Sequence, residues 1–310
     1  MNLIVLRARM SGRENGGMAW KKNVTPQSVY RRQLASKLRE LRDQAGLSLA
    51  DVGAQIEINQ GSLSRIESGE RGTTPLLVNA LLDCYGVQDP AIREDVLDLV
   101  RADRAQSKPW WRKYSAVLSP TRYDGYLTLE ANAVSLRSYQ PLLLPGLLQT
   151  QAYAEAVIAG MRLDLTSRQV KSLVEVRLER QKERLGGERL TKLWAVVEES
   201  VLMRQVGPPE VMRDQLARLI DIEETPHITL QLLPMAIGVH PGLYGPFVLM
   251  GFSDPSSDLV WLENPQNSVY LEAREDVDAY ADSFDHLRAR ALGPPETRAR
   301  IERLIKELPK

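Results

Sequence analysis

The stretch that decides the fold of the first part of the chain reads Leu47-Ser-Leu-Ala-Asp-Val-Gly-Ala-Gln-Ile-Glu-Ile-Asn-Gln-Gly-Ser-Leu-Ser-Arg-Ile-Glu-Ser-Gly69. It predicts two short helices joined by a tight turn. Ser48 is a favourable N-cap residue for the first helix. Leu49, Val52 and Ile56 then fall at i, i+3 and i+7, so this helix has one apolar side that faces inward. Gly53 lies on that side and, lacking a side chain, lets another helix come close.

The second of these helices carries a polar outer face. Asn59 is the expected N-cap, Leu63 and Ile66 supply the buried edge, and Gly69 stands where a helix ends in the left-handed conformation. The outward residues are Gln60, Gly61, Ser62, Ser64 and Arg65. Gln can form two hydrogen bonds to adenine and Arg can fork onto guanine. The helix therefore has the chemistry of a major-groove reader.

A known family shares these motifs. The run from Leu38-Arg-Glu-Leu-Arg-Asp-Gln-Ala-Gly-Leu-Ser-Leu49 to Ser64-Arg-Ile-Glu-Ser-Gly69 resembles the lambda-repressor-like, Xre-type helix-turn-helix family over about residues 34–87. The resemblance implies that bases are contacted by Gln60, Gly61 and Arg65. It implies that phosphates are contacted by Ser48, Ser62, Ser64, Ser68 and Arg71. It also implies an ion pair between Arg42 and Glu67, which makes Glu67 structural and not catalytic.

Two positions depart from the pattern of that family. Glu57 stands at the turn, where Gly is preferred, and a positive φ at a non-Gly residue costs roughly 1 kcal/mol. Leu49 replaces the Gln that is common at the first position of the second helix, which removes one expected phosphate contact.

Charge and length set further limits. The 310 residues allow two domains with cores, at 43% hydrophobic content, and the 40 basic and 40 acidic side chains give no net charge. Residues 30–90 contain seven basic and eight acidic side chains. Affinity for double-stranded DNA must then come from a local face, including Arg31, Arg32, Arg65 and Arg71. Weak binding by one copy favours a homodimer on a pseudo-palindromic site.

Other composition features favour a cytoplasmic protein. Cys84 is the single cysteine and fits a small core residue, so no disulfide framework is expected. No apolar run approaches the ~20 residues of a membrane span, and the start is a poor signal peptide. Residues 1–29 are expected to be disordered. Either Met1 or Met18 could begin the natural protein, and Lys21 and Lys22 could instead form a basic arm on the DNA backbone.

The rest of the chain suggests how the domains are arranged. Helices are expected over residues 31–45, 74–86 and 89–105, which completes a helix-turn-helix domain at 30–105. A boundary follows at residues 105–112, where Trp110 and Trp111 fit an anchor on the next domain better than a cation-binding or stacking site.

The second domain is expected at residues 108–290, followed by a C-terminal helix at 294–310. Its expected helices cover residues 123–137, 152–158, 167–185, 209–223, 277–292 and 295–308, and its expected strands cover 193–198, 228–233, 247–252, 259–262 and 269–271. Residues 138–153 contain two prolines and a glycine and are expected to form an extended connection. The charges of the 167–185 helix fit a solvated face. The fold class is therefore an all-α helix-turn-helix domain followed by an α+β regulatory domain.

A second resemblance covers about residues 105–285. Trp110-Trp-Arg112, Tyr139-Gln-Pro-Leu-Leu-Leu-Pro-Gly-Leu-Leu-Gln-Thr150, Arg177-Leu-Glu-Arg-Gln181, His240-Pro-Gly-Leu-Tyr-Gly-Pro-Phe247 and Val269-Tyr-Leu-Glu272 look like the C-terminal domain of the WhiJ-like regulators of actinomycetes. The likeness implies gene regulation and a small partner protein, in an arrangement described as toxin-antitoxin-like. It implies no ligand or cofactor.

Catalysis and metal binding are not expected. His227, His240 and His286 have no metal-ligand spacing. His240 could be a base over a pocket, but a hydrogen bond inside a turn is the favoured interpretation. Glu198 and Glu199 are adjacent on a strand end and so face opposite ways, which argues against a shared proton transfer.

The sequence therefore predicts a sequence-specific transcriptional regulator that is dimeric and whose second domain senses a small partner protein or a ligand. An antitoxin-like interaction module that regulates its own operon remains open, as does a repressor that senses a small molecule. The operator, the sign of regulation and the effector are not predicted.

Overall fold

The computed structural model describes residues 28–105, 109–119, 123–186, 190–222, 224–263 and 268–309. The expectations for Met1, Met18, Lys21 and Lys22 lie outside these residues. Ser28 and Val29, which were expected to be disordered, belong to the fold: the Ser28 side chain accepts a hydrogen bond from the backbone NH of Arg31 and caps a helix that begins at Val29.

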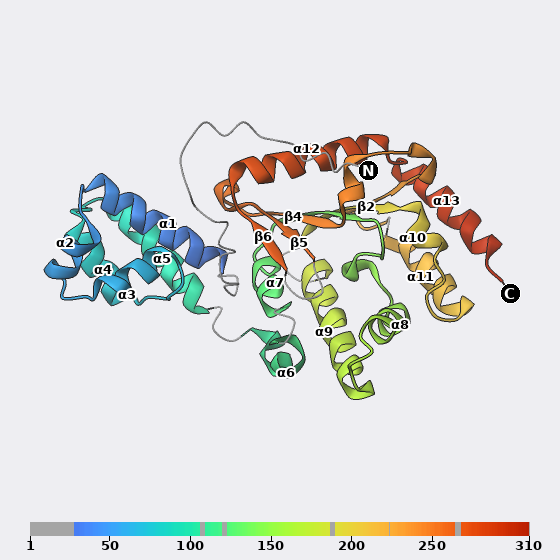
Figure 1. Ribbon diagram of the computed structural model, residues 1–310, viewed down its shortest axis with the longest axis horizontal. Helices are drawn as coiled ribbons and strands as arrows, with labels where there is room; N and C mark the ends of the chain where they lie inside the picture. Colours follow the sequence, from blue (N-terminus) through green and yellow to red (C-terminus); the bar gives the residue numbers. More distant parts are fainter. Residues whose placement is uncertain are drawn as a thin grey trace, which may run out of the picture.

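The first part of the chain is a bundle of five helices (Figure 1). They are α1 (Val29–Gln44), α2 (Leu49–Gln55), α3 (Gln60–Glu67), α4 (Pro75–Cys84) and α5 (Pro90–Ala105). Their apolar sides meet in one core, in which Leu38, Val52 and Leu63 are fully buried. Cys84 is partly buried against this core. The all-helical prediction for this region is confirmed.

The second part is built on a six-stranded mixed sheet with the order β3-β2-β1-β4-β5-β6. The strands are β1 (Ser135–Gln140), β2 (Lys192–Glu198), β3 (Ile228–Leu233), β4 (Phe247–Gly251), β5 (Leu259–Leu262) and β6 (Val269–Leu271). β1, β2 and β3 are parallel, whereas β4, β5 and β6 continue the sheet as antiparallel neighbours. Helices surround this sheet, so the α+β prediction is confirmed.

Two sets of helices cover the two faces of the sheet (Figure 1). One face packs against α7 (Tyr123–Glu130), α8 (Gln151–Met161), α9 (Ser167–Leu185), α11 (Pro209–Ile222) and α13 (Pro294–Glu307). The other face packs against α12 (Arg274–Arg290). The shorter helical segments are η1 (Trp110–Tyr114), α6 (Ser115–Leu118), η3 (Gly146–Leu148), α10 (Glu199–Met203), η4 (Met235–Ile237), η5 (Pro241–Tyr244) and η6 (Pro255–Ser257).

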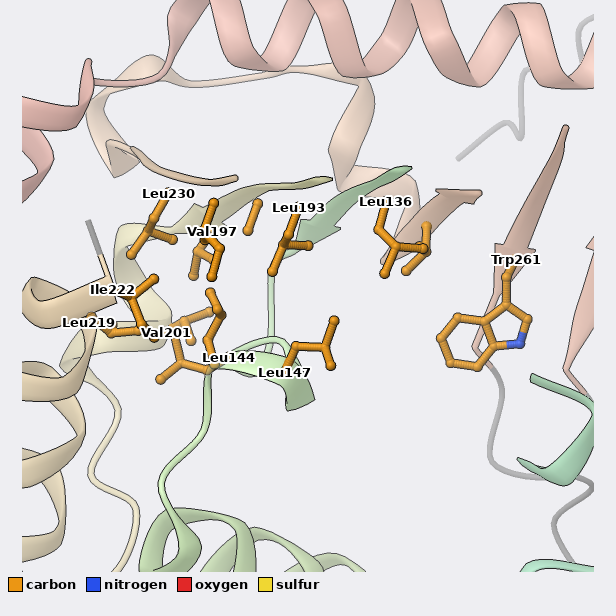
Figure 2. Packing of buried hydrophobic residues seen from close by; sticks show 14 of the residues in the cluster. Leu136, Leu144, Leu147, Leu193, Val197, Val201, Leu219, Ile222, Leu230 and Trp261 are labelled. Carbon is orange, nitrogen blue, oxygen red and sulfur yellow. The ribbon is translucent and has the colours of Figure 1, made fainter. Parts of the chain in front are cut away.

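Alternate residues of the central strands enter the two cores, as the two-residue period of a strand requires. Leu193 and Val197 of β2 enter the larger core, whereas Val196 enters the core beneath α12. Figure 2 shows the larger core, where Leu193 and Val197 lie above Leu144 and Leu147. Both faces of β2 are thereby buried, which explains its nearly continuous apolar sequence.

The predictions for residues 123–153 were wrong at two points. The helix was expected to continue to Arg137, but α7 ends at Glu130, and residues 135–140 form β1 instead of an extended connection. β1 lies at the centre of the sheet between β2 and β4. Pairing with these two strands stabilises it, although its sequence Ser-Leu-Arg-Ser-Tyr-Gln has low strand propensity. The proline-containing stretch begins only after it.

The first helix touches both parts of the chain. Val29 is buried in the larger core of the second part, while Leu34 and Leu38 are buried in the helical bundle. Arg32 donates a hydrogen bond from Nη2 to the carbonyl oxygen of Ser257, 3.0 Å away, and its Nε lies 3.3 Å from Glu272 Oε1. Trp110 and Trp111 pack against the larger core, as an anchor would.

Candidate nucleic-acid interface

Helix α3 presents one polar face to solvent. Leu63, Ile66 and Glu67 are buried, whereas Gln60, Gly61, Ser64 and Arg65 are exposed and Ser62 is partly exposed. The three-residue and four-residue spacing of the buried positions produces this division. The structure thus places the three residues expected to contact bases on one exposed face.

The approach to α3 is shaped by a strained turn. Glu57 has a φ of 53°, the left-handed value expected at this turn. Asn59 follows as N-cap, and its Oδ1 accepts a hydrogen bond of 2.8 Å from the backbone NH of Gly61. A Cβ on Gly53 would lie 2.8 Å from the carbonyl oxygen of Ile58. The same Cβ would lie 3.8 Å from the backbone nitrogen of Gln60, so the turn before α3 and the first residue of α3 both come close to Gly53, as expected.

Two arginines border the exposed face of α3. Arg65 donates from Nε to the carbonyl oxygen of Gly61, 3.2 Å away on the same helix. Arg71, in the loop after α3, donates from Nη1 to Ser62 Oγ over 3.0 Å, and the Ser68 hydroxyl lies 3.3 Å from the carbonyl oxygen of Arg65. Both guanidinium groups sit at the edge of the face that would approach DNA, and guanidinium is a strong phosphate and guanine ligand.

Ser48 is already engaged with a carboxylate at the start of α2. Its hydroxyl lies 2.6 Å from Asp51 Oδ2, and it also accepts a hydrogen bond from the Asp51 backbone NH. Hydrogen bonds from the side chain and backbone of Ser48 lower the pKa of Asp51, so this carboxylate is charged at neutral pH. A phosphate at Ser48 must therefore approach a fixed negative charge.

Arg42 and Glu67 form the contact expected between α1 and α3. Arg42 Nε lies 2.9 Å and 3.0 Å from the two Glu67 carboxylate oxygens, and Tyr85 donates its hydroxyl to Oε1 over 3.2 Å. The hydrogen bond to Glu67 raises the pKa of Arg42, and burial raises the pKa of Tyr85. The pair holds α3 against α1 on the buried side of α3, opposite the exposed face of α3.

Two further arginines expected to support DNA binding have other partners. Arg31 donates from Nε and Nη2 to Asp103 Oδ2 over 3.0 and 2.9 Å, and Arg32 contacts Glu272 and Ser257. The expectation that Arg32 lies on the DNA-binding face was wrong, because its guanidinium faces the second part of the chain. Burial lowers the pKa of Arg32, against the opposing effect of Glu272.

The second part holds a buried ion pair that the sequence did not reveal. Arg180 Nε lies 2.5 Å from Glu130 Oε2, and Tyr123 and Tyr126 place their hydroxyls 2.7 Å and 3.1 Å from the same guanidinium. The charges of α9 were expected to form a solvated face, which is wrong for Arg180 and Arg184 because both are buried. The available sequence signal for a buried charge on α9 was the pair Arg177 and Arg180, because residues three apart lie on one side of a helix.

His240 also lies in a buried polar cluster. Its Nε2 is 3.1 Å from Glu198 Oε1, which accepts a 2.7 Å hydrogen bond from the Tyr139 hydroxyl. Glu199 instead receives Arg300 Nε at 2.6 Å and the backbone NH of Met235 at 3.2 Å. The two adjacent glutamates therefore have separate partners, and His240 fixes the loop after β3 to the ends of β1 and β2.

Among the residues that the structure describes, no group of three or more His, Cys, Asp and Glu side chains is arranged to hold a metal ion. None of the helices in the same part of the chain combines the length and apolar content that a membrane crossing requires.

A family model described as a helix-turn-helix domain matches residues 33–96, which covers α2, α3 and the Arg42–Glu67 pair. No curated protein and no solved structure matches the chain. The helix-turn-helix domain indicates a regulator of the DNA-binding type. A second model, described as a domain of unknown function (DUF5753), matches residues 123–303, more than half of the chain, and the chain therefore belongs to the DUF5753 family.

Proposed function

We propose that this protein is a sequence-specific transcriptional regulator that reads double-stranded DNA as a homodimer through α3. The observation that carries the proposal is the single polar face on which Gln60, Gly61 and Arg65 are exposed, above the buried Arg42–Glu67 pair. One such helix covers too few base pairs for useful selectivity, which supports two copies on a pseudo-palindromic site.

The finer family assignment is part of this proposal. The likeness to Xre-type and WhiJ-like regulators supports a regulatory role for the second domain. In this proposal the second domain binds and does not catalyse, and the protein acts in the cytoplasm. Sensing by that domain would alter the relative positions of the two reading helices. The coupling free energy of such effects is typically ~1 to 3 kcal/mol.

Selection of bound sequences from random duplex DNA tests the proposal. The full-length protein is compared with a Gln60→Ala/Arg65→Ala variant and with a control Gln44→Ala/Arg101→Ala variant, whose changes lie on exposed positions of α1 and α5. We expect a motif of two half-sites with the wild type and the control, and none with the Gln60→Ala/Arg65→Ala variant. A motif that survives the loss of Gln60 and Arg65 would refute the assignment of α3 as the reader.

A second candidate is an antitoxin-like interaction module that regulates its own operon. It is favoured by exposed apolar side chains in the loop between β3 and β4, where Val239 is 86% and Leu243 64% exposed. Such side chains grouped on one surface mark protein contacts. Copurification of a small acidic protein at fixed stoichiometry, lost with Val239→Asp/Leu243→Asp, would support this candidate. Unchanged copurification with that variant would count against this loop as the contact.

A further inference from the structure

Helix α9 brings two arginines together over a glycine. Figure 1 shows α9 on the same face of the sheet as α7. A Cβ on Gly146 of η3 would lie 3.1 Å from Arg180 Nη1 and 3.4 Å from Arg177 Nε. Both guanidinium groups therefore lie against the backbone at Gly146, and a larger side chain there would push them away. Two positive charges this close repel each other unless negative charge is supplied.

The carboxylate of Glu130 neutralises Arg180 and leaves Arg177 without a counter-ion in contact. Arg180 Nε lies 2.5 Å from Glu130 Oε2, and Arg180 Nη2 lies 2.6 Å from Oε1. Arg177 instead donates from Nη1 to the neutral side chain of Gln149, whose Oε1 is 2.5 Å away. Among the residues that the structure describes, no carboxylate oxygen lies within 4.0 Å of the Arg177 guanidinium. One positive charge is therefore in excess at this place.

Arg177 is held in position and is still reached by solvent. Gln149 is buried, and its Nε2 donates to the carbonyl oxygen of Leu144 over 2.8 Å, so the acceptor for Arg177 is itself fixed. Arg177 is half-buried. Burial lowers the pKa of Arg177, and the charge of Arg180 lowers it as well. A cation that is partly removed from water without a counter-ion costs free energy, and such groups gather at functional sites.

Tyr123 of α7 supplies a second donor beside the two arginines. Its hydroxyl oxygen accepts a hydrogen bond of 2.7 Å from Arg180 Nη1, so the hydroxyl proton is left to donate to another group. Burial raises the pKa of Tyr123, which keeps this donor neutral, and the charge of Arg177 also acts on the phenol. The ring is stacked on Tyr126 with centroids 5.2 Å apart and is half-buried. Tyr123 is therefore a fixed donor that solvent can reach.

We propose that Arg177 and Tyr123 bind the carboxylate of a small molecule. A guanidinium group and a hydroxyl group both donate to carboxylate oxygens, and guanidinium forms strong charge-assisted hydrogen bonds with them. The single uncompensated charge of Arg177 matches a monoanion. A phosphate monoester carries about −1.5 to −2 at neutral pH and would bring excess negative charge beside Glu130.

Glu263, which follows β5, is the carboxyl group of the protein that competes with such a ligand. Burial raises the pKa of Glu263 above its ordinary value, against the opposing effect of Arg177 and Arg180. Glu263 thus interacts with both arginines over a distance and forms no ion pair with either among the described contacts. A ligand carboxylate that contacts Arg177 directly would take over this interaction from Glu263.

The place of Glu263 connects the site with the regulator proposed above, and an effector role for the ligand rests on that proposed function. Glu263 follows one end of β5, while Ser257 lies just before the other end. Glu272 follows β6, which pairs with β5. Ser257 and Glu272 hold Arg32 of α1. A carboxylate that displaces Glu263 can therefore act through the β5–β6 hairpin on the helix that supports α3.

Nuclear magnetic resonance on the full-length protein tests the site without DNA. The probes are acetate and acetamide, which are similar in shape but differ in charge, and the reporters are the Nε–H signals of Arg177 and Arg180. We expect acetate to shift both signals to saturation, at a concentration roughly tenfold below that needed to shift exposed Arg168 on the same helix. Equal responses to acetate and acetamide, or equal responses of Arg177 and Arg168 to acetate, would overturn the proposal.

A third probe, methyl phosphate, tests the choice of a monoanion. We expect methyl phosphate to shift the Arg177 and Arg180 signals only at higher concentrations than acetate. Saturation by methyl phosphate at lower concentrations than acetate would overturn the assignment of the ligand as a carboxylate.

Matched variants then test the residues. Arg177→Gln should abolish the effect of acetate on the Arg180 signal, and Tyr123→Phe should weaken acetate binding by roughly 3-fold to 10-fold. Glu263→Gln removes the competing carboxyl group and should strengthen acetate binding by roughly 3-fold to 10-fold. Lys171→Gln, which removes a positive charge from the exposed side of α9, should leave binding unchanged. Because Glu263→Gln retains both arginines, its result decides the proposal even if Arg177→Gln does not fold. Weaker binding with Glu263→Gln, or unchanged binding with Arg177→Gln, would refute the site.

A DNA-binding titration with acetate, and with acetamide as control, tests the effector role separately. A change in DNA affinity that acetate causes in the wild type but not in Tyr123→Phe at the same concentration would support this role. Acetate binding without any effect on DNA affinity would refute the effector role and leave the binding site established. Failure to bind any DNA would refute the proposed function and not the carboxylate site.

Discussion

Arg42 of α1 and Glu67 of α3 meet in a two-point contact, with Arg42 Nε at 2.9 Å and 3.0 Å from the two carboxylate oxygens. Glu67 is only 3% exposed, and Arg42 Nη1 also donates to the carbonyl oxygen of Leu47 over 2.8 Å. The pair therefore connects three elements: α1, the segment before α2, and α3. It sets the position of the exposed face of α3 without contributing a residue to that face.

Arg42→Ala should destabilise the helical bundle strongly. The substitution leaves the Glu67 carboxylate buried without its cation, and breaking a buried pair in this way costs about 3 to 5 kcal/mol. Urea unfolding followed by far-ultraviolet circular dichroism measures the effect. Arg101→Ala is the control, because Arg101 contacts Glu94 and Asp98 on the surface, where solvent screens the ion pair and its loss changes stability little. Equal losses in the two variants would contradict a special role for the Arg42–Glu67 pair.

Arg65→Ala and Arg71→Ala should differ in their effects on DNA binding. Loss of a base-reading Arg65 should cost ~1 to 3 kcal/mol of binding free energy and relax one base position. Loss of Arg71 should weaken binding to all sequences alike and reduce the salt slope by about one. Affinity measured over a range of salt concentrations, on the selected site and on its single-base variants, separates these outcomes. If the two variants behave identically, the assignment of reader and phosphate contact is wrong.

Gly242→Ala should destabilise the second part of the chain. A Cβ at this position would lie 2.4 Å from the ring of Tyr139, which is fully buried and hydrogen-bonded to Glu198. Overpacking of this kind costs typically about 1 to 3 kcal/mol, measurable as a lower urea midpoint. Gly160→Ala on α8 is the control, because nothing lies within 4 Å of the new Cβ. Alanine there should leave stability unchanged or raise it by up to about 1 kcal/mol.

Glu199 should contribute stability that depends on pH. Burial favours its neutral form, but hydrogen bonds from Arg300 and from the Met235 backbone outweigh burial and lower the pKa of Glu199 below its ordinary value. This contribution is present above the unfolded pKa, near 4.5, and is lost as the pH falls through the folded pKa. Glu199→Gln should therefore reduce the unfolding free energy at neutral pH, and the difference from wild type should shrink on acidification. Urea unfolding at pH values on both sides of this range measures the difference, with Glu155→Gln on the exposed side of α8 as control. A difference that grows on acidification would contradict the stated direction.

The sequence predicted most of the elements because their apolar periods are strong. The strand at 228–233 and the helix at 167–185 were placed at the bounds that the structure has. β1 was missed because its polar residues Ser135, Arg137 and Ser138 hide a strand that is held by β2 and β4 on both sides. Local sequence does not contain that information, since the pairing partners lie far away along the chain.

The candidate site was predictable to a similar degree, and for a similar reason. Gln60 and Arg65 could be placed on one exposed face from spacing within a single helix. The partners of Arg32 and Arg180 could not, because Glu272 and Glu130 belong to other elements and no local pattern connects them.

Helix α1 has a consequence for any attempt to divide the protein. Val29 at the start of α1 is buried in the larger core of the second part, while Leu38 in the middle of α1 is buried in the helical bundle. A fragment that begins after Ala105 lacks Val29 and leaves its place in the larger core empty. A fragment that ends at Ala105 exposes the Val29 side chain to solvent. A chimera that transfers the helical bundle to another protein must therefore replace Val29 and Arg32 with surface residues, and the remaining fragment must fill the vacated position with a side chain of its own.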